Sequence, residues 1–213
     1  MAVIFDMDGV LFDSEPLHIR AWQAIMAPHG HEFASSWFLR WVGIPDWKLA
    51  GYLHEELGMG ASCDEVLQQK RLHYLAITSS ELHPFPGVSE GLHALRARGI
   101  AIAVATSSNR ENCHHTLECT GLAGYFPLQV TAEDVTKHKP EPDPFLRAAE
   151  LLGTSPALCT VIEDSPAGID AARAAGCRVL GVTSSHDADT LTGADYVFSS
   201  TAEAIGWVLA GGE

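Results

Sequence analysis

The stretch from Val3 to Val10, with the sequence VIFDMDGV, constrains the fold of this chain more than any other segment. It is an apolar run that ends in two carboxylates and a glycine, which predicts a buried strand whose carboxyl end opens into a loop. Because side chains two apart in an extended segment point the same way, Asp6 and Asp8 can converge on one small volume. Gly9 allows the backbone to turn sharply beside them.

Two close carboxylates repel each other, so such a site requires compensation. A cation held between them, protonation of one of them, or both would relieve the repulsion. The arrangement suits a hard metal with oxygen ligands, such as magnesium, together with a phosphoryl group. For an isolated D-x-D motif, a strand that merely ends in a polar turn is an equally good interpretation, and the rest of the chain has to decide.

Length and charge limit the classes of protein to consider. The 213 residues, 46% of them hydrophobic, suit one sizeable domain or a core domain with a smaller insertion. The net charge of -14 argues against a general affinity for nucleic acid or for a membrane surface, because both rely on clustered Lys and Arg. No apolar run approaches the roughly 18 residues of a membrane span, and no signal peptide is recognisable, which predicts a cytoplasmic protein. The five cysteines include no C-x-x-C pair and are predicted to be free thiols.

Between Ser14 and His83 the sequence pattern is helical. Helices are predicted from Glu15 to about Ala27 with Ser14 as N-cap, near Ser36 to Val42, from Asp46 to Gly58, and from Asp64 to about Ser80. The region holds no convincing strand signal, whereas the sequence on either side alternates strand and helix signals. We therefore predict a helical cap over residues 14–83, inserted into a catalytic core made of residues 1–13 and 84–213.

Beyond the insertion, short apolar strands alternate with helices. The predicted strands are Ile100–Ala105, Leu128–Thr131, Cys159–Ile162, Arg178–Val182 and Tyr196–Phe198, followed by a terminal helix from Ala202 to Leu209. Asp143 and Ser165 are expected to cap two of the intervening helices. This alternation predicts an α/β fold with a Rossmann-like parallel sheet as its core.

Polar loops follow four of the predicted strands. They contain Asp6 and Asp8, Thr106 and Ser107, Lys139, and Glu163 and Asp164. In a parallel sheet the carboxyl ends of all strands lie at one edge, so these groups can meet in a single cleft. Only four lysines occur in this acidic chain, and the position of Lys139 in such a loop favours a role in anion binding over a solvated surface charge.

Taken in order, these motifs resemble those of the haloacid dehalogenase-like phosphohydrolases. More narrowly, they are similar to the branch that contains β-phosphoglucomutase and the small sugar-phosphate phosphatases. The matching motifs are Asp6-x-Asp8-Gly9-Val10, Thr106-Ser107-Ser108-Asn109, Lys139-Pro140-x-Pro142-Asp143 and Glu163-Asp164-Ser165. Each motif alone is weak, but all four occur in order at strand ends, and the resemblance extends over nearly the whole chain, including the inserted cap.

The resemblance implies specific roles for the acidic residues. Asp6 would be the nucleophile that forms an aspartyl-phosphate, and its ordinary pKa would keep it ionised at neutral pH. Asp8 would act as general acid and base. Mg²⁺ would be held by the carboxylate of Asp6, the backbone carbonyl of Asp8 and the side chain of Asp164, with Glu163 in or beside the coordination shell.

The resemblance also implies how substrate would be bound. Lys139 would help Mg²⁺ to offset the repulsion between the nucleophile and the phosphate. Thr106, the amide of Ser107, and Asn109 would contact the phosphoryl group. In the cap, the candidates for contact with the substrate are His18, Gly43, Lys48 and Lys70. A helix-surface histidine without function is nearly as good an interpretation of His18, and the cap tryptophans Trp37, Trp41 and Trp47 are expected to be core more often than sugar-stacking surfaces.

We predict from these observations a magnesium-dependent phosphatase that hydrolyses a small phosphorylated metabolite, of the sugar or polyol phosphate type, as a monomer or weak homodimer. A phosphomutase of the β-phosphoglucomutase type is the main alternative, and a non-enzymatic phosphoaspartate signalling or binding module is a less favoured one. Mutase relatives carry an arginine just after a glycine in the cap loop, where this chain has Gly43-Ile44-Pro45-Asp46. An acid at that position favours hydrolysis, although Lys48 or Lys70 could compensate.

Overall fold

The computed structural model describes residues 1–41, 46–58 and 60–212 of the chain. These residues form two compact units, one made of Met1–Asp13 with His83–Glu213 and the other of Ser14–Leu82. Each unit has its own hydrophobic core. In the described part of the chain, none of the helices combines the length and hydrophobicity needed to cross a bilayer.

A parallel sheet forms the centre of the first unit, with the strand order β3-β2-β1-β4-β5-β6. The strands are β1 (Ala2–Phe5), β2 (Ala101–Ala105), β3 (Gln129–Val130), β4 (Cys159–Glu163), β5 (Arg178–Val182) and β6 (Tyr196–Phe198). β1 lies between β2 and β4, and its last residue, Phe5, is in register with Val104 and Ile162. The predicted Rossmann-like parallel sheet is thereby confirmed, and this register brings the carboxyl ends of three strands to the same edge.

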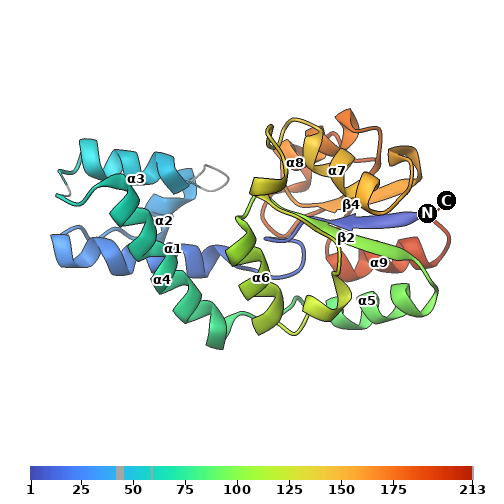
Figure 1. Cartoon of the computed structure of the whole chain (residues 1–213), viewed down its shortest axis with the longest axis horizontal. Coiled ribbons are helices and arrows are strands. Elements are labelled where there is room, and N and C mark those ends of the chain that lie inside the picture. Colours follow the sequence, from blue (N-terminus) through green and yellow to red (C-terminus); the bar gives the residue numbers. More distant parts are fainter. Residues whose placement is uncertain (42–45, 59, 213) are drawn as a thin grey trace. The chain divides into compact units, whose positions relative to one another are not determined.

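Helices cover both faces of this sheet. They are α5 (Val88–Ala97), α6 (Arg110–Cys119), α7 (Asp143–Leu151), α8 (Pro166–Ala174) and α9 (Thr201–Leu209). Figure 1 shows α7 and α8 over one face of the sheet and α5 and α9 over the other. On the first face, Ile4 of β1 packs in one cluster with Phe145 of α7 and Ile169 of α8. Every residue of β1 is buried, as expected for a strand that is covered on both sides.

In its described residues, the second unit contains helices as its only regular secondary structure. It coincides to within one residue with the predicted cap and is called the cap below. It contains α1 (Glu15–Met26), η1 (Ala27–His29), α2 (Ser35–Phe38), η2 (Leu39–Trp41), α3 (Asp46–Glu55) and α4 (Cys63–Glu81). Its core joins Trp22 and Ile25 of α1 with Leu49 and Leu53 of α3 and Val66 of α4. The longest helix, α4, begins with a capping box, in which Ser62 and Glu65 satisfy each other's backbone N–H groups.

Several predicted helix starts and cysteine states can be compared with the structure. Ser165 caps α8 by accepting a hydrogen bond from the Gly168 N–H at 3.1 Å, as predicted, and all five cysteines are free. The prediction for Asp143 is wrong by one position, because Pro142 is the N-cap of α7 and Asp143 is already helical. Ser14 does occupy the N-cap of α1, but its backbone is helical, with φ -91° and ψ -17°, and its side chain makes no capping hydrogen bond.

We expect the cap core to tolerate truncation at Leu53 poorly, because this side chain is 0% exposed. Leu53→Ala should lower the free energy of unfolding by about 2–5 kcal/mol, through lost burial and the cavity left behind. Leu72→Ala is the matched control, since Leu72 lies in α4 with 52% of its surface exposed, and should change stability by no more than about 0.5 kcal/mol. Urea denaturation followed by circular dichroism measures both. Equal losses for the two variants would contradict this assignment of the cap core.

Candidate active site

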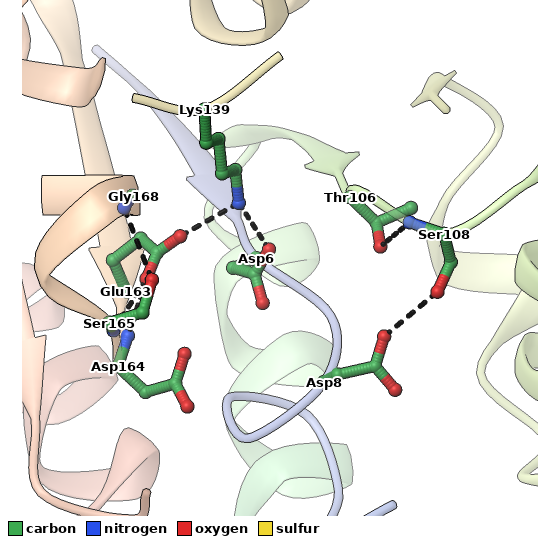
Figure 2. Close-up of polar contacts among 9 residues, drawn as sticks. All are labelled: Asp6, Asp8, Thr106, Ser108, Lys139, Glu163, Asp164, Ser165 and Gly168. Atoms are coloured by element: carbon green, nitrogen blue, oxygen red, sulfur yellow. Dashed lines mark hydrogen bonds and ion pairs between the residues drawn. The ribbon is translucent and has the colours of Figure 1, made fainter. Parts of the chain in front are cut away.

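Asp6 directly follows β1 and lies at the centre of the candidate site. Its backbone N–H donates to the carbonyl of Ile162 at 3.0 Å, which extends the ladder between β1 and β4 by one residue. Its carboxylate is buried and accepts a hydrogen bond from the ammonium group of Lys139, which reaches the site from the loop before α7. The same ammonium donates to Glu163 Oε1 at 2.7 Å, so Lys139 links the ends of β1 and β4 (Figure 2).

Glu163, the last residue of β4, is fixed by a dense set of hydrogen bonds. Its Oε2 accepts from the backbone N–H groups of Asp164 and Ser165, both at 2.8 Å, and from the Ser165 hydroxyl at 3.0 Å. Gly168 lies against the same carboxylate, at a distance that leaves no room for a Cβ atom. With both oxygens engaged and the side chain 1% exposed, Glu163 is a rigid anchor for Lys139.

Three carboxylates converge in this region. Asp6, Glu163 and Asp164 are all buried, and each offers one oxygen within 4.8 Å of the others. With these acids ionised and Lys139 as the cation bonded to two of them, the group carries an excess of two negative charges away from water. Carboxylate oxygens are the ligands that hard divalent cations prefer, so the donor set and its charge fit such an ion.

Burial raises the pKa of Asp6 to about 7, with Lys139 opposing the rise and Glu163 adding to it. The pKa of Asp164 is also raised, again through burial and then through the charge of Glu163. Desolvation therefore opposes the ionised form of Asp6 that its ordinary pKa predicts, while Lys139 favours it. A bound cation would favour the ionised form further.

Asp8, Thr106 and Ser108 form the other side of the site. The Ser108 hydroxyl donates to Asp8 Oδ2 at 3.1 Å, and the Ser108 N–H donates to Thr106 Oγ1 at 3.0 Å. Figure 2 shows Asp6 between this group and the group formed by Lys139, Glu163 and Asp164. Because Thr106 Oγ1 already accepts a hydrogen bond, its own hydrogen is free to be donated to an anion.

The remaining predicted residues of the core lie nearby. Ser107 is exposed beside Thr106. Asn109 caps α6, and its Oδ1 accepts a hydrogen bond from the Asn112 N–H at 2.8 Å. Asn109 therefore has a structural role as the N-cap of α6, and its contact with substrate stays a prediction.

In the cap, three residues form one hydrogen-bonded group. The ammonium group of Lys70 lies 2.6 Å from Asp46 Oδ2 and 2.7 Å from His18 Nδ1, and the His18 ring stacks on Tyr74 at 4.0 Å. Lys48 is exposed, with its ammonium group 5.6 Å from the centre of the Trp47 ring. Gly43, the fourth cap candidate, lies outside the described residues.

The cap tryptophans differ from one another. Trp37 and Trp41 pack against the cap core, as expected. Trp47, the second residue of α3, is 61% exposed, so the expectation of a core position is wrong for this residue.

The comparisons with known proteins agree with this geometry. The family model described as haloacid dehalogenase-like hydrolase matches residues 3–182. The chain belongs to this family of hydrolases. It is 33% identical to a phosphorylated carbohydrates phosphatase of Thermotoga maritima, over 86% of both chains. It is 34% identical to a fructose-1-phosphate phosphatase of Escherichia coli, over 84% of this chain and 95% of the relative.

The structure of this hydrolase is similar to a crystal structure described as a putative β-phosphoglucomutase from Thermotoga maritima, with a TM-score of 0.86, 31% identity and 97% of each chain covered. The resemblance inferred from the sequence motifs is therefore confirmed. The expectation of an enzyme that hydrolyses phosphoric monoesters is confirmed as well, since the named relatives of this hydrolase are phosphatases.

Sequence reasoning missed one segment of the hydrolase's site, Ser184–His186. The Ser184 hydroxyl donates to the carbonyl of Gly9, and His186 Nδ1 lies 3.1 Å from the carbonyl oxygen of Asp164. The segment follows β5, so the rule that found the other polar loops at strand ends applied here too. It was overlooked because it carries no acid and no lysine.

The contact between Gly168 and Glu163 predicts that a single methyl group disturbs the site. A Cβ atom at Gly168 would lie 1.6 Å from Glu163 Oε1, and the hydrogen bonds of Glu163 prevent it from moving aside. Gly168→Ala should therefore lower both the melting temperature and the phosphatase activity. Gly206→Ala in α9 is the matched control, because a Cβ atom there meets nothing within 4 Å, and it should stabilise the protein by about 0.4–1 kcal/mol. A Gly168→Ala enzyme with wild-type stability and rate would contradict the assignment of Glu163 as a rigid anchor for Lys139.

Proposed function

We propose that this hydrolase is a Mg²⁺-dependent phosphatase that cleaves the phosphate monoester of a small sugar or polyol through an aspartyl-phosphate on Asp6. The observation that carries the proposal is the buried group of Asp6, Glu163 and Asp164 around one lysine. The relatives of this hydrolase support the substrate class. Two are named as phosphatases of phosphorylated carbohydrates and of fructose 1-phosphate, and a third, 33% identical, is named hexitol phosphatase A.

In the proposed first step, a carboxylate oxygen of Asp6 attacks phosphorus, and the bond from phosphorus to the ester oxygen breaks. Asp8 gives its proton to the departing alkoxide, and the sugar leaves as an alcohol. In the second step, Asp8 takes a proton from water as the water oxygen attacks phosphorus. The bond from Asp6 to phosphorus then breaks, which releases inorganic phosphate and regenerates both carboxyl groups.

The surrounding residues support both steps. Lys139 holds the Asp6 carboxylate in place and reduces its repulsion toward the phosphoryl group, while Thr106 has a hydroxyl hydrogen to donate to a phosphoryl oxygen. Ser108 holds the Asp8 carboxyl group in place through its hydrogen bond to Oδ2. Mg²⁺, held by Asp6, Asp164 and the carbonyl of Asp8, would supply the positive charge that lets an anionic nucleophile approach an anionic phosphate.

A phosphomutase is the second candidate, because a structural relative at 31% identity is described as a putative β-phosphoglucomutase. A mutase holds a doubly phosphorylated intermediate and needs a cation for the second phosphate. In this cap, Lys70 is already paired with Asp46, at 2.6 Å, and its side chain is only 3% exposed. Its charge is balanced within the cap, which favours hydrolysis over phosphate transfer. Lys48 is exposed and keeps the alternative open to test.

The nucleophile and metal assignments predict the outcome of a phosphate-release assay with fructose 1-phosphate. Wild-type activity should require Mg²⁺ and disappear on chelation. Asp6→Asn should lower the rate by several orders of magnitude, since the amide cannot form the phosphoenzyme. Asp189→Asn, the same change at an exposed position, should have no effect. Near-normal turnover of Asp6→Asn, or full activity in chelator, would overturn the proposal.

The pairing of Lys70 with Asp46 predicts the balance between hydrolysis and transfer. With a hexose 1-phosphate, Mg²⁺ and a trace of the matching bisphosphate, free phosphate should appear faster than hexose 6-phosphate. Asp46→Asn should release the charge of Lys70 and raise the affinity for the bisphosphate, measured as competitive inhibition of phosphate release. Faster formation of hexose 6-phosphate by the wild type would instead identify a mutase.

A further inference from the structure

We infer that the segment Ser184–His186 is a positioning element for the metal site and that Ser185 orients the carboxylate of Asp164 toward the cation. The inference rests on the proposed function, because it takes Asp164 as a ligand of Mg²⁺. None of the three residues is proposed to touch substrate. Their role is to fix the distance between Asp164, the metal ligand, and the turn that follows Asp8.

The segment contacts the site at three successive residues. Ser184 donates to the carbonyl of Gly9, in the turn that follows Asp8. The Ser185 hydroxyl lies beside the carboxylate of Asp164, since a Cβ atom placed on Gly9 would meet Asp164 Oδ2 and Ser185 Oγ together. His186 Nδ1 lies 3.1 Å from the carbonyl oxygen of Asp164, and because a carbonyl can only accept, Nδ1 is the donor in this contact. One short segment therefore contacts both the backbone and the side chain of Asp164, together with the turn after Asp8.

The space around Gly9 shows how closely these groups fit. A Cβ atom on Gly9 would lie 1.9 Å from Asp164 Oδ2 and 2.5 Å from Ser185 Oγ. Gly9 also has a φ of +80°, which favours glycine. Asp164 Oδ2 is thus confined between the Gly9 backbone and Ser185, while Figure 2 shows the carboxylate of Asp164 directed toward Asp6.

The position of the segment in the fold gives it this reach. β5 is hydrogen-bonded to β4, with Gly181 in register with Glu163, so the chain leaving β5 passes beside Asp164. Loss of a hydrogen bond that orients a ligand typically weakens metal affinity about 10- to 100-fold. A purely structural role in the loop would instead change stability and leave metal affinity intact.

The test is the affinity for Mg²⁺, measured by isothermal titration calorimetry on the full chain without substrate. Ser185→Ala should bind Mg²⁺ at least about 10-fold more weakly than wild type. Ser155→Ala is the matched control, since Ser155 is exposed in the same unit and its side chain makes no capping hydrogen bond, and it should bind like wild type. Melting temperatures without metal establish that both variants are folded.

Asp164→Asn separates failure of the inference from failure of the proposed function. If the wild type binds no Mg²⁺, or Asp164→Asn binds it as well as wild type, the proposed metal site itself is wrong. If Asp164→Asn loses affinity while Ser185→Ala retains it, only the inference is overturned.

A measurement on the wild type covers the case in which Ser185→Ala does not fold. Mg²⁺ should slow amide hydrogen exchange at residues 184–186, because the segment is bound to the ligand that the metal fixes. Exchange at these amides that is unchanged by Mg²⁺ would also overturn the inference.

Discussion

The position of the Lys139 ammonium group between Asp6 and Glu163 is the interaction on which the rest of this active site depends. All three side chains are largely out of contact with water, and burying an ion pair is costly unless further hydrogen bonds complete it. Glu163 supplies that completion through its bonds to two backbone N–H groups and to Ser165. The carboxylates of Asp6 and Glu163 raise the pKa of Lys139 even though burial alone would lower it, so the lysine stays charged. One cation facing three acids still leaves a negative excess, which is the physical basis for a metal.

The sheet supplies this arrangement from strands that are adjacent in space and distant in sequence. β1 delivers Asp6, its neighbour β2 leads to Thr106 and Ser108, and its other neighbour β4 ends in Glu163. Gly168 in the first turn of α8 allows that helix to approach the Glu163 carboxylate. The backbone N–H groups of Asp164 and Ser165, which immediately precede this helix, donate to the same carboxylate. The parallel sheet therefore brings together charged side chains that are far apart in the sequence.

Much of the fold was predictable because its signals are local. Apolar runs bounded by polar or glycine residues gave β5 and β6 with their observed limits, and the helical period gave the helices of the cap to within a few residues. The convergence of the acids at one sheet edge was predictable because Asp6 and Asp164 follow buried strands and Glu163 ends one. Residues such as Ser184–His186 were not, since serine after a strand is common and only the contacts of β5 with β4 bring this segment to Asp164. The elevated pKa of Asp6 was equally out of reach, because burial is a property of the assembled site.

Lys139 and Lys70 both have buried side chains, yet their surroundings differ in charge. The number of lysines in a sequence therefore does not predict the number of anion-binding sites. Lys139 is bonded to two carboxylates and lies near a third, so its surroundings keep a negative excess, which fits a hard cation. Lys70 is bonded to the carboxylate of Asp46 and to an uncharged nitrogen of His18, which leaves that group balanced. From the sequence alone Lys70 was a candidate ligand for a phosphate, because the pairing joins residues 24 positions apart across two helices. Its pairing with Asp46 makes Lys70 an internal contact of the cap, with its charge compensated by a neighbouring carboxylate.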